Sequence, residues 1–144
     1  MNTLPRFPDH VSIREVGPRD GLQNEEVILT TAQKVQLIDR LADTGLSLIE
    51  VGAFVRPASV PQMADTADVF AAISRRPGVV YSAIVPNAIG ARRAVAAQAD
   101  ALQVFLSASE SQIVAMSICR SSNRWRRLPT SRLSPVKQAC VSRR

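Results

Sequence analysis

The chain has 144 residues, a length typical of one domain, and its apolar content of 46% is that of an ordinary globular protein. It contains no run of 18 apolar residues and no apolar segment near its start, so we expect neither a transmembrane helix nor a signal peptide. Its two cysteines, Cys119 and Cys140, match no metal or disulfide pattern, and a cytoplasmic location is the default expectation.

The net charge of +6 is unevenly distributed along the chain. Residues 1–112 contain ten Lys/Arg and all twelve Asp/Glu, whereas residues 113–144 contain eight Lys/Arg and no acidic residue. The second segment is rich in Arg and Ser and has no sustained hydrophobic period, which is typical of a basic tail of low order. We therefore predict a folded part at 1–112 and a disordered tail at 113–144. The abrupt loss of acidic residues suggests, as a hypothesis, a reading-frame change in GC-rich coding DNA.

Strand and helix periods alternate along the first part. In chain order we predict a strand at 11–16, a helix from Thr30 to Gly45, a strand at 47–51, a helix around 63–71, a strand at 79–85, a helix from Asn87 to about Ala97 and a strand at 101–106. Thr30 and Gln33 form a capping box for the first helix, and Gly45 suits the left-handed position at its end. Pro77 and Gly78 are expected to stop the second helix.

This alternation indicates an α/β fold in which a parallel sheet is covered by helices. Two architectures remain open, an open doubly wound sheet and a (β/α)8 TIM barrel. A closed barrel needs about 250 residues, so four strands would form the N-terminal half of one.

Polar residues follow each predicted strand. Arg19 and Asp20 follow the first strand, Glu50 ends the second, Asn87 follows the third, and residues 107–110 follow the fourth. Because ligands of parallel α/β folds bind at the C-terminal ends of the strands, we expect these residues to share one rim.

The types of these residues indicate the chemistry. Asp20 offers a hard oxygen ligand for Mg²⁺ or Mn²⁺, and Arg19 offers a permanent charge for a carboxylate or a developing enolate oxygen. Glu50 can orient either group or take part in proton transfer. The alternative is an Arg–Asp or Arg–Glu ion pair that closes the mouth of the fold, and spacing alone leaves both open. His10 is expected to be a solvated loop residue.

The segments VSIREVGPRDGLQNE and GLSLIEVGAFVRPASVPQMAD, the Pro-Asn pair after the third strand and FLSASE after the fourth carry a resemblance. Together they resemble the 3-hydroxy-3-methylglutaryl-CoA lyase family, whose members are metal-dependent enzymes built on the (β/α)8 barrel. The similarity runs from Val11 to Ser111.

The resemblance implies a retro-Claisen cleavage of 3-hydroxy-3-methylglutaryl-CoA to acetoacetate and acetyl-CoA, a step of leucine catabolism. Asp20 corresponds to a ligand of the divalent metal, Mg²⁺ or Mn²⁺. Arg19 corresponds to the catalytic arginine that binds the substrate and stabilises the enolate-like thioester oxygen. Glu50 corresponds to the catalytic glutamate that supports this arginine, and Gln23 to a substrate-binding glutamine. The expected partners are an acyl-CoA substrate and, for the intact family member, further copies of itself.

Several groups expected from the family are absent from the sequence. There is no His-x-His pair, and neither cysteine lies on a glycine-rich loop. We therefore expect this chain to be inactive, or nearly so, on its own. Two alternatives stay open: a related acyl-CoA-dependent aldolase or synthase, against which the Gln23-bearing motif argues, and a non-enzymatic fragment whose basic tail binds nucleic acid. The tail alternative is the less favoured, and nucleic acid is not an expected partner.

Overall fold

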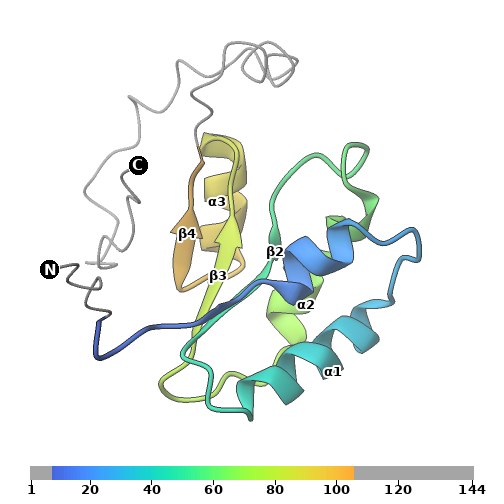
Figure 1. Ribbon diagram of the computed structural model, residues 1–144. Helices are drawn as coiled ribbons and strands as arrows, with labels where there is room; N and C mark the ends of the chain where they lie inside the picture. Colours follow the sequence, from blue (N-terminus) through green and yellow to red (C-terminus); the bar gives the residue numbers. More distant parts are fainter. Residues whose placement is uncertain (1–7, 106–144) are drawn as a thin grey trace, which may run out of the picture.

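The computed structural model describes residues 8–105 (Figure 1). The predictions for Leu106, for residues 107–110, for the tail at 113–144 and for its two cysteines lie outside the described residues. In chain order the elements are β1 (Arg14–Glu15), the π-helical turn η1 (Gly17–Gly21), α1 (Thr31–Ala42), β2 (Leu48–Ala53), the 3-10 turn η2 (Pro61–Met63), α2 (Thr66–Ala72), β3 (Val80–Ile84), α3 (Ala88–Ala96) and β4 (Ala101–Gln103). Within residues 8–105, no helix is both long and apolar enough to cross a membrane.

The four strands form one parallel sheet in the order β1-β2-β3-β4. Each strand is added beside the strand that precedes it in the chain. A doubly wound sheet instead reverses its direction of growth at a switch point and places helices on both faces. The described strands therefore follow the barrel pattern and not the doubly wound one.

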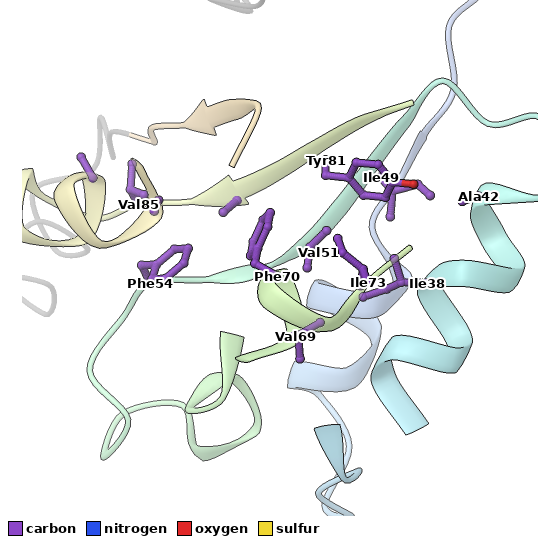
Figure 2. Close-up of a cluster of buried hydrophobic side chains, with 13 residues drawn as sticks. Ile38, Ala42, Ile49, Val51, Phe54, Val69, Phe70, Ile73, Tyr81 and Val85 are labelled. Carbon is purple, nitrogen blue, oxygen red and sulfur yellow. The ribbon is translucent and has the colours of Figure 1, made fainter. Parts of the chain in front are cut away.

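One apolar cluster joins all three α-helices to the same face of the sheet (Figure 2). Ile38 of α1, Phe70 of α2 and Ala91 of α3 are buried in it, together with Ile49 of β2 and Tyr81 of β3. Since successive side chains of a strand point to opposite faces, the residue after Ile49 points away from the helices. The fold therefore leaves the opposite face of β2 free for polar groups.

The two outer strands are shorter than predicted. The first strand was expected over 11–16, but only Arg14 and Glu15 are paired, and Val11 and Ile13 are exposed. The fourth is paired over Ala101–Gln103. Within the described part of the chain each of these strands has a neighbour on one side only, so fewer ladder hydrogen bonds fix its ends.

The predicted ends of α1 are confirmed. Thr30 Oγ1 accepts a hydrogen bond from the backbone N–H of Gln33 at 3.3 Å, and Gln33 Oε1 accepts one from the N–H of Thr30 at 2.9 Å. Gly45 has a φ of 86°, the left-handed conformation that was expected after the helix.

The second helix differs from its prediction. The segment expected as a helix around 63–71 divides into η2 and α2. α2 ends well before Pro77 and Gly78, because Ile73 is already extended, with a ψ of 144°. The N–H of Ser74 then donates to Asp39 Oδ1 at 2.9 Å, which gives the chain a partner outside the helix.

The third helix begins as predicted at Asn87, whose Oδ1 accepts hydrogen bonds from the N–H groups of Ile89 and Gly90, both at 3.0 Å. Gly90 lies against the end of β2: a Cβ atom placed on it would lie 2.7 Å from the carbonyl oxygen of Phe54. The absence of a side chain at this position therefore lets α3 approach the sheet.

A buried ion pair joins α1 to the start of α2. Lys34 is only 4% exposed, and its Nζ lies 2.5 Å from Asp65 Oδ1. Thr31 Oγ1 donates to the other carboxylate oxygen of Asp65 at 2.7 Å. Burial raises the pKa of Asp65, but the hydrogen bonds from Lys34 and Thr31 and the Lys34 charge together hold that pKa below its ordinary value of 3.8.

We predict that Gly90→Ala destabilises the chain by about 1–2 kcal/mol, although Ala is the better helix former, because the added methyl group meets a backbone oxygen. Urea denaturation would measure the change in the free energy of unfolding. Gly21→Ala is the matched control, since nothing lies within 4 Å of a Cβ at Gly21. Equal stability of the two variants would contradict the packing argument.

We also predict that acid weakens the fold through Asp65. Because its pKa is lower in the folded state, its contribution is fully present above the ordinary pKa and is lost as the pH falls through the folded value. Between roughly pH 5 and pH 3, the free energy of unfolding should therefore fall more steeply for the wild type than for Asp65→Asn.

Asp43→Asn serves as the control for this pH series. Its hydrogen bond to Arg76 lowers the pKa of Asp43, but this pair lies on the exposed surface. When urea midpoints are measured at a series of pH values, the midpoint of Asp43→Asn should therefore fall with pH about as steeply as that of the wild type. A wild-type slope no steeper than that of Asp65→Asn would show that the buried pair does not respond to acid.

Candidate functional site

The turn η1 places Arg19 and Asp20 directly after β1. The carbonyl oxygen of Val16 accepts hydrogen bonds from the N–H groups of Arg19, at 3.0 Å, and of Asp20, at 2.7 Å. Pro18, which is buried, occupies the start of the turn, where its fixed φ and missing N–H are tolerated. The turn packs against β2, so both charged residues lie over that strand.

Arg19 forms ion pairs with two carboxylates. Its Nε donates to Glu50 Oε1, and its Nη1 donates to Asp20 Oδ1. The Arg19 side chain is 15% exposed, that of Glu50 is fully buried, and that of Asp20 is 52% exposed. The guanidinium is therefore fixed from the protein side by Glu50, and the site opens toward solvent at Asp20.

Glu50 lies in a different place from the one predicted. It was expected at the end of the second strand, but β2 continues to Ala53, so Glu50 is its third residue. The strand continues past Glu50 because Gly52 and Ala53 pair with Ala83 and Ile84 of β3. The side chain consequently points to the face away from the helices, inside the fold rather than at its rim.

One oxygen of Glu50 is left without a partner. Among the described residues, Glu50 Oε2 is the buried side-chain nitrogen or oxygen atom that has no hydrogen bond. A buried carboxylate oxygen without a partner is energetically unfavourable, and a catalytic role is one of the explanations for such an atom in a native protein. Glu50 therefore holds Arg19 with one oxygen and keeps a second acceptor at the site.

The other predicted site residues are less closely involved. Gln23 lies half-buried just after η1, and its side chain makes no hydrogen bond to another described residue. Asn87 caps α3, as described above, and so has a structural task. His10 is exposed ahead of β1, as expected for a loop residue. One surface groove runs along α1, and a second lies between residues 11–15 and the segment 41–47; neither is lined by Arg19 or Asp20.

Asp20 fits a divalent metal as one ligand of several. Its half-exposed carboxylate is a hard oxygen donor of the kind that Mg²⁺ and Mn²⁺ prefer. Within residues 8–105 there is no group of three or more His, Cys, Asp or Glu that could hold a metal ion. Further ligands would therefore come from outside the described residues or from a substrate.

The face of the sheet that carries Glu50 also carries a polar contact that was not predicted from the sequence. Arg14 Nη1 of β1 donates to Gln103 Oε1 of β4 at 2.5 Å, across the two central strands. Arg14 pairs in register with Leu48, two residues before Glu50, and so shares its face. This shared face could have been predicted from the sequence, because side chains alternate between the two faces along each strand.

Comparison with known proteins gives a consistent result. A family model described as HMGL-like matches residues 10–131. Among curated relatives, the mouse (Mus musculus) 3-hydroxy-3-methylglutaryl-CoA lyase, cytoplasmic, is 55% identical over 108 residues, which cover 75% of this chain and 32% of the relative. The mitochondrial hydroxymethylglutaryl-CoA lyase of Macaca fascicularis is 51% identical over 110 residues, which cover 76% of this chain and 33% of that protein.

A solved structure supports the fold assignment. The hydroxymethylglutaryl-CoA lyase of Pseudomonas aeruginosa superposes with a TM-score of 0.72 at 48% identity, over 76% of this chain and 36% of that one. The described residues thus have the α/β fold of the first four strands of a TIM-barrel lyase, as predicted. This chain spans about a third of the length of the curated relatives that it matches. The predicted boundary at residue 112 stays a prediction.

We predict that Arg19→Met lowers the free energy of unfolding by about 3 kcal/mol, because it leaves the buried Glu50 carboxylate without its cation. The double variant Arg19→Met/Glu50→Met should lose less than Arg19→Met alone, since it removes both charges. Urea denaturation of four chains, the wild type, Arg19→Met, Glu50→Met and the double variant, would measure the coupling. A double variant as unstable as the sum of its single changes would show that the two side chains are not coupled.

Proposed function

Because this chain belongs to the HMGL-like family, we propose that it supplies the arginine and aspartate half of the active site of a 3-hydroxy-3-methylglutaryl-CoA lyase. The reaction is cleavage of the substrate's carbon–carbon bond to give acetoacetate and acetyl-CoA. The named relatives are lyases acting on this thioester. This chain spans about a third of their length. The activity is therefore proposed for a whole protein, in which this chain would act together with further segments.

The observation that carries the proposal is the fixed guanidinium of Arg19. It is held by the buried Glu50 and lies beside the half-exposed Asp20, at the C-terminal end of β1. A preorganised cation in a partly buried setting favours a transition state in which negative charge develops on an oxygen. Carbon–carbon cleavage next to a thioester develops such a charge on the thioester oxygen.

Arg19 and Glu50 have separate tasks in this reaction. Cleavage begins with loss of the proton from the tertiary hydroxyl group, leaves the bonding electrons on the thioester enolate, and ends when that enolate takes up a proton at carbon to give acetyl-CoA. Arg19 donates hydrogen bonds to that enolate oxygen. Glu50 acts through Arg19, whose orientation it fixes with Oε1. No described residue is assigned as the base that removes the hydroxyl proton.

Asp20 would hold a divalent metal together with ligands from outside the described residues. When bound, such a cation supplies Lewis-acid charge to the substrate's oxygens. Asp20 keeps its carboxylate half-exposed for this purpose while one of its oxygens accepts from Arg19. Mg²⁺ and Mn²⁺ are the candidates, because their preferred ligands are oxygens.

The remaining features are proposed with the same reaction. Gln23, which follows Asp20 after two residues, would contact the substrate, and the binding partner would be an acyl-CoA thioester. The proposal also includes a cytoplasmic location, a place in leucine catabolism and self-assembly of the intact protein. The cytoplasmic name of the mouse relative supports the location, whereas the macaque relative is named mitochondrial.

A chimeric enzyme would test the proposal. Residues 10–105 of this chain would replace the corresponding segment of the Pseudomonas aeruginosa lyase. We expect the chimera to release acetoacetate from 3-hydroxy-3-methylglutaryl-CoA in the presence of Mn²⁺. Arg19→Met within the chimera should lower kcat by about 10²–10³-fold, the usual effect of removing a group that stabilises an oxyanion.

Arg76→Gln is the control within the chimera, because Arg76 lies in an exposed ion pair with Asp43. This variant should keep the activity of the unmodified chimera. The proposal fails if a folded chimera binds the thioester without cleaving it. It also fails if Arg19→Met retains full turnover.

A further inference from the structure

We propose that Gln62 is a positioning residue for the loop at residues 22–30, and that Lys34 and Asp65 hold Gln62 in place for this task. The loop connects η1 to α1 and carries Gln23. The inference rests on the proposed function, because it concerns the segment that follows Arg19 and Asp20.

The loop at 22–30 has few ties of its own. Val27 is 71% exposed and Ile28 is 54% exposed, so the apolar side chains at its tip contribute little packing. Asn24 Nδ2 donates to the carbonyl oxygen of Asp20 at 2.8 Å, a bond that stays within the same segment. The position of the loop must therefore be fixed largely by contacts from other elements.

Gln62 supplies such a contact. Its Nε2 donates to the carbonyl oxygen of Glu25 at 2.8 Å. Among the described residues, this is the one side-chain hydrogen bond that joins residues 22–29 to an element other than η1 and α1. Gln62 belongs to η2, which follows β2, the strand of Glu50. The bond thus joins the two loops that follow the strands supplying the proposed site.

The backbone of Gln62 is held by a separate contact. Its carbonyl oxygen accepts a hydrogen bond from Lys34 Nζ at 2.7 Å. Pro61 restricts the preceding backbone, and Met63 is buried in a small apolar cluster with Ala53 and Ile84. The side-chain amide is therefore presented to Glu25 by a segment that has little freedom to move.

Lys34 is itself fixed by its charge partner. It is buried on α1, and its ammonium group lies between Asp65 Oδ1, at 2.5 Å, and the carbonyl oxygen of Gln62. A buried ammonium group needs such partners, because it has been removed from water. The contacts form a continuous path from α1 through Lys34 and Gln62 to Glu25.

The task of Gln62 can be separated from that of the ion pair. The hydrogen bond to Glu25 comes from the side chain of Gln62, whereas the bond to Lys34 uses its backbone. Gln62→Met removes the amide donor, keeps the side-chain length and leaves the Lys34–Asp65 pair intact. The variant therefore releases the loop without opening the buried pair.

Hydrogen exchange of backbone amides in the full chain would test this role. We expect Gln62→Met to accelerate exchange at Asn24 and Glu25 by about three- to tenfold, the effect of losing one hydrogen bond. In the folded chain these two amides donate to the carbonyl oxygens of Gly21 and Leu22. Exchange in α3 and the melting temperature should remain those of the wild type.

Two further variants complete the test. Lys34→Met should accelerate exchange both at residues 22–25 and at 62–65, because it releases the backbone of Gln62 as well. Arg76→Gln, which breaks an exposed bond at the other end of α1, should leave exchange at residues 22–25 unchanged.

The positioning role is wrong if Gln62→Met leaves exchange at Asn24 and Glu25 unchanged. It is equally wrong if exchange rises to the same extent in α3 and the sheet, since that would be a general loss of stability. The readout needs no turnover. An inactive chimera would thus refute the proposed lyase while leaving the exchange result standing, and the converse also holds.

Discussion

The buried carboxylate of Glu50 is the constraint on which the rest of this structure depends. A charge at the centre of a sheet is very costly unless a cation and hydrogen bonds accompany it. Arg19 provides the cation and one hydrogen bond, from a turn 31 residues earlier in the chain. To reach Glu50, the chain must leave β1 in the tight turn η1 and fold back over β2. The same turn brings Asp20 to the surface beside the guanidinium, so one ion pair orders the whole candidate site.

The sheet makes room for this pair because its helices lie on one face. Ile49 and Tyr81 belong to the apolar cluster that the sheet shares with α1, α2 and α3, and they lie near Ala42 of α1 (Figure 2). Glu50 and its register partner Ser82 are buried on the other face, as the alternation of strand side chains requires. A doubly wound sheet would cover that face with apolar helices and exclude a charged group there. The barrel arrangement is therefore also what permits the chemistry.

Much of this fold was predictable from local signals, and the site was predictable in part. Arg19 and Asp20 were placed correctly after the first strand, because Gly and Pro neighbours mark the turn. Glu50 was identified, but its position in mid-strand was not, since strand ends depend on the neighbours that pair with them. Lys34 gave no signal as a buried residue: on a helix it is ordinarily solvated, and only Asp65, 31 residues away, explains its burial.

The sequence by itself determined the order of the strands and helices, the capping of α1 by Thr30 and of α3 by Asn87, the left-handed Gly45 and the motif that indicates a lyase. These features depend on residues a few positions apart, whose backbone hydrogen bonds are local. The tertiary structure alone decided that Arg19 is held by Glu50 and that Gln62 reaches Glu25. Burial and pairing are set by segments far apart in the chain, and no local pattern states which segments will meet.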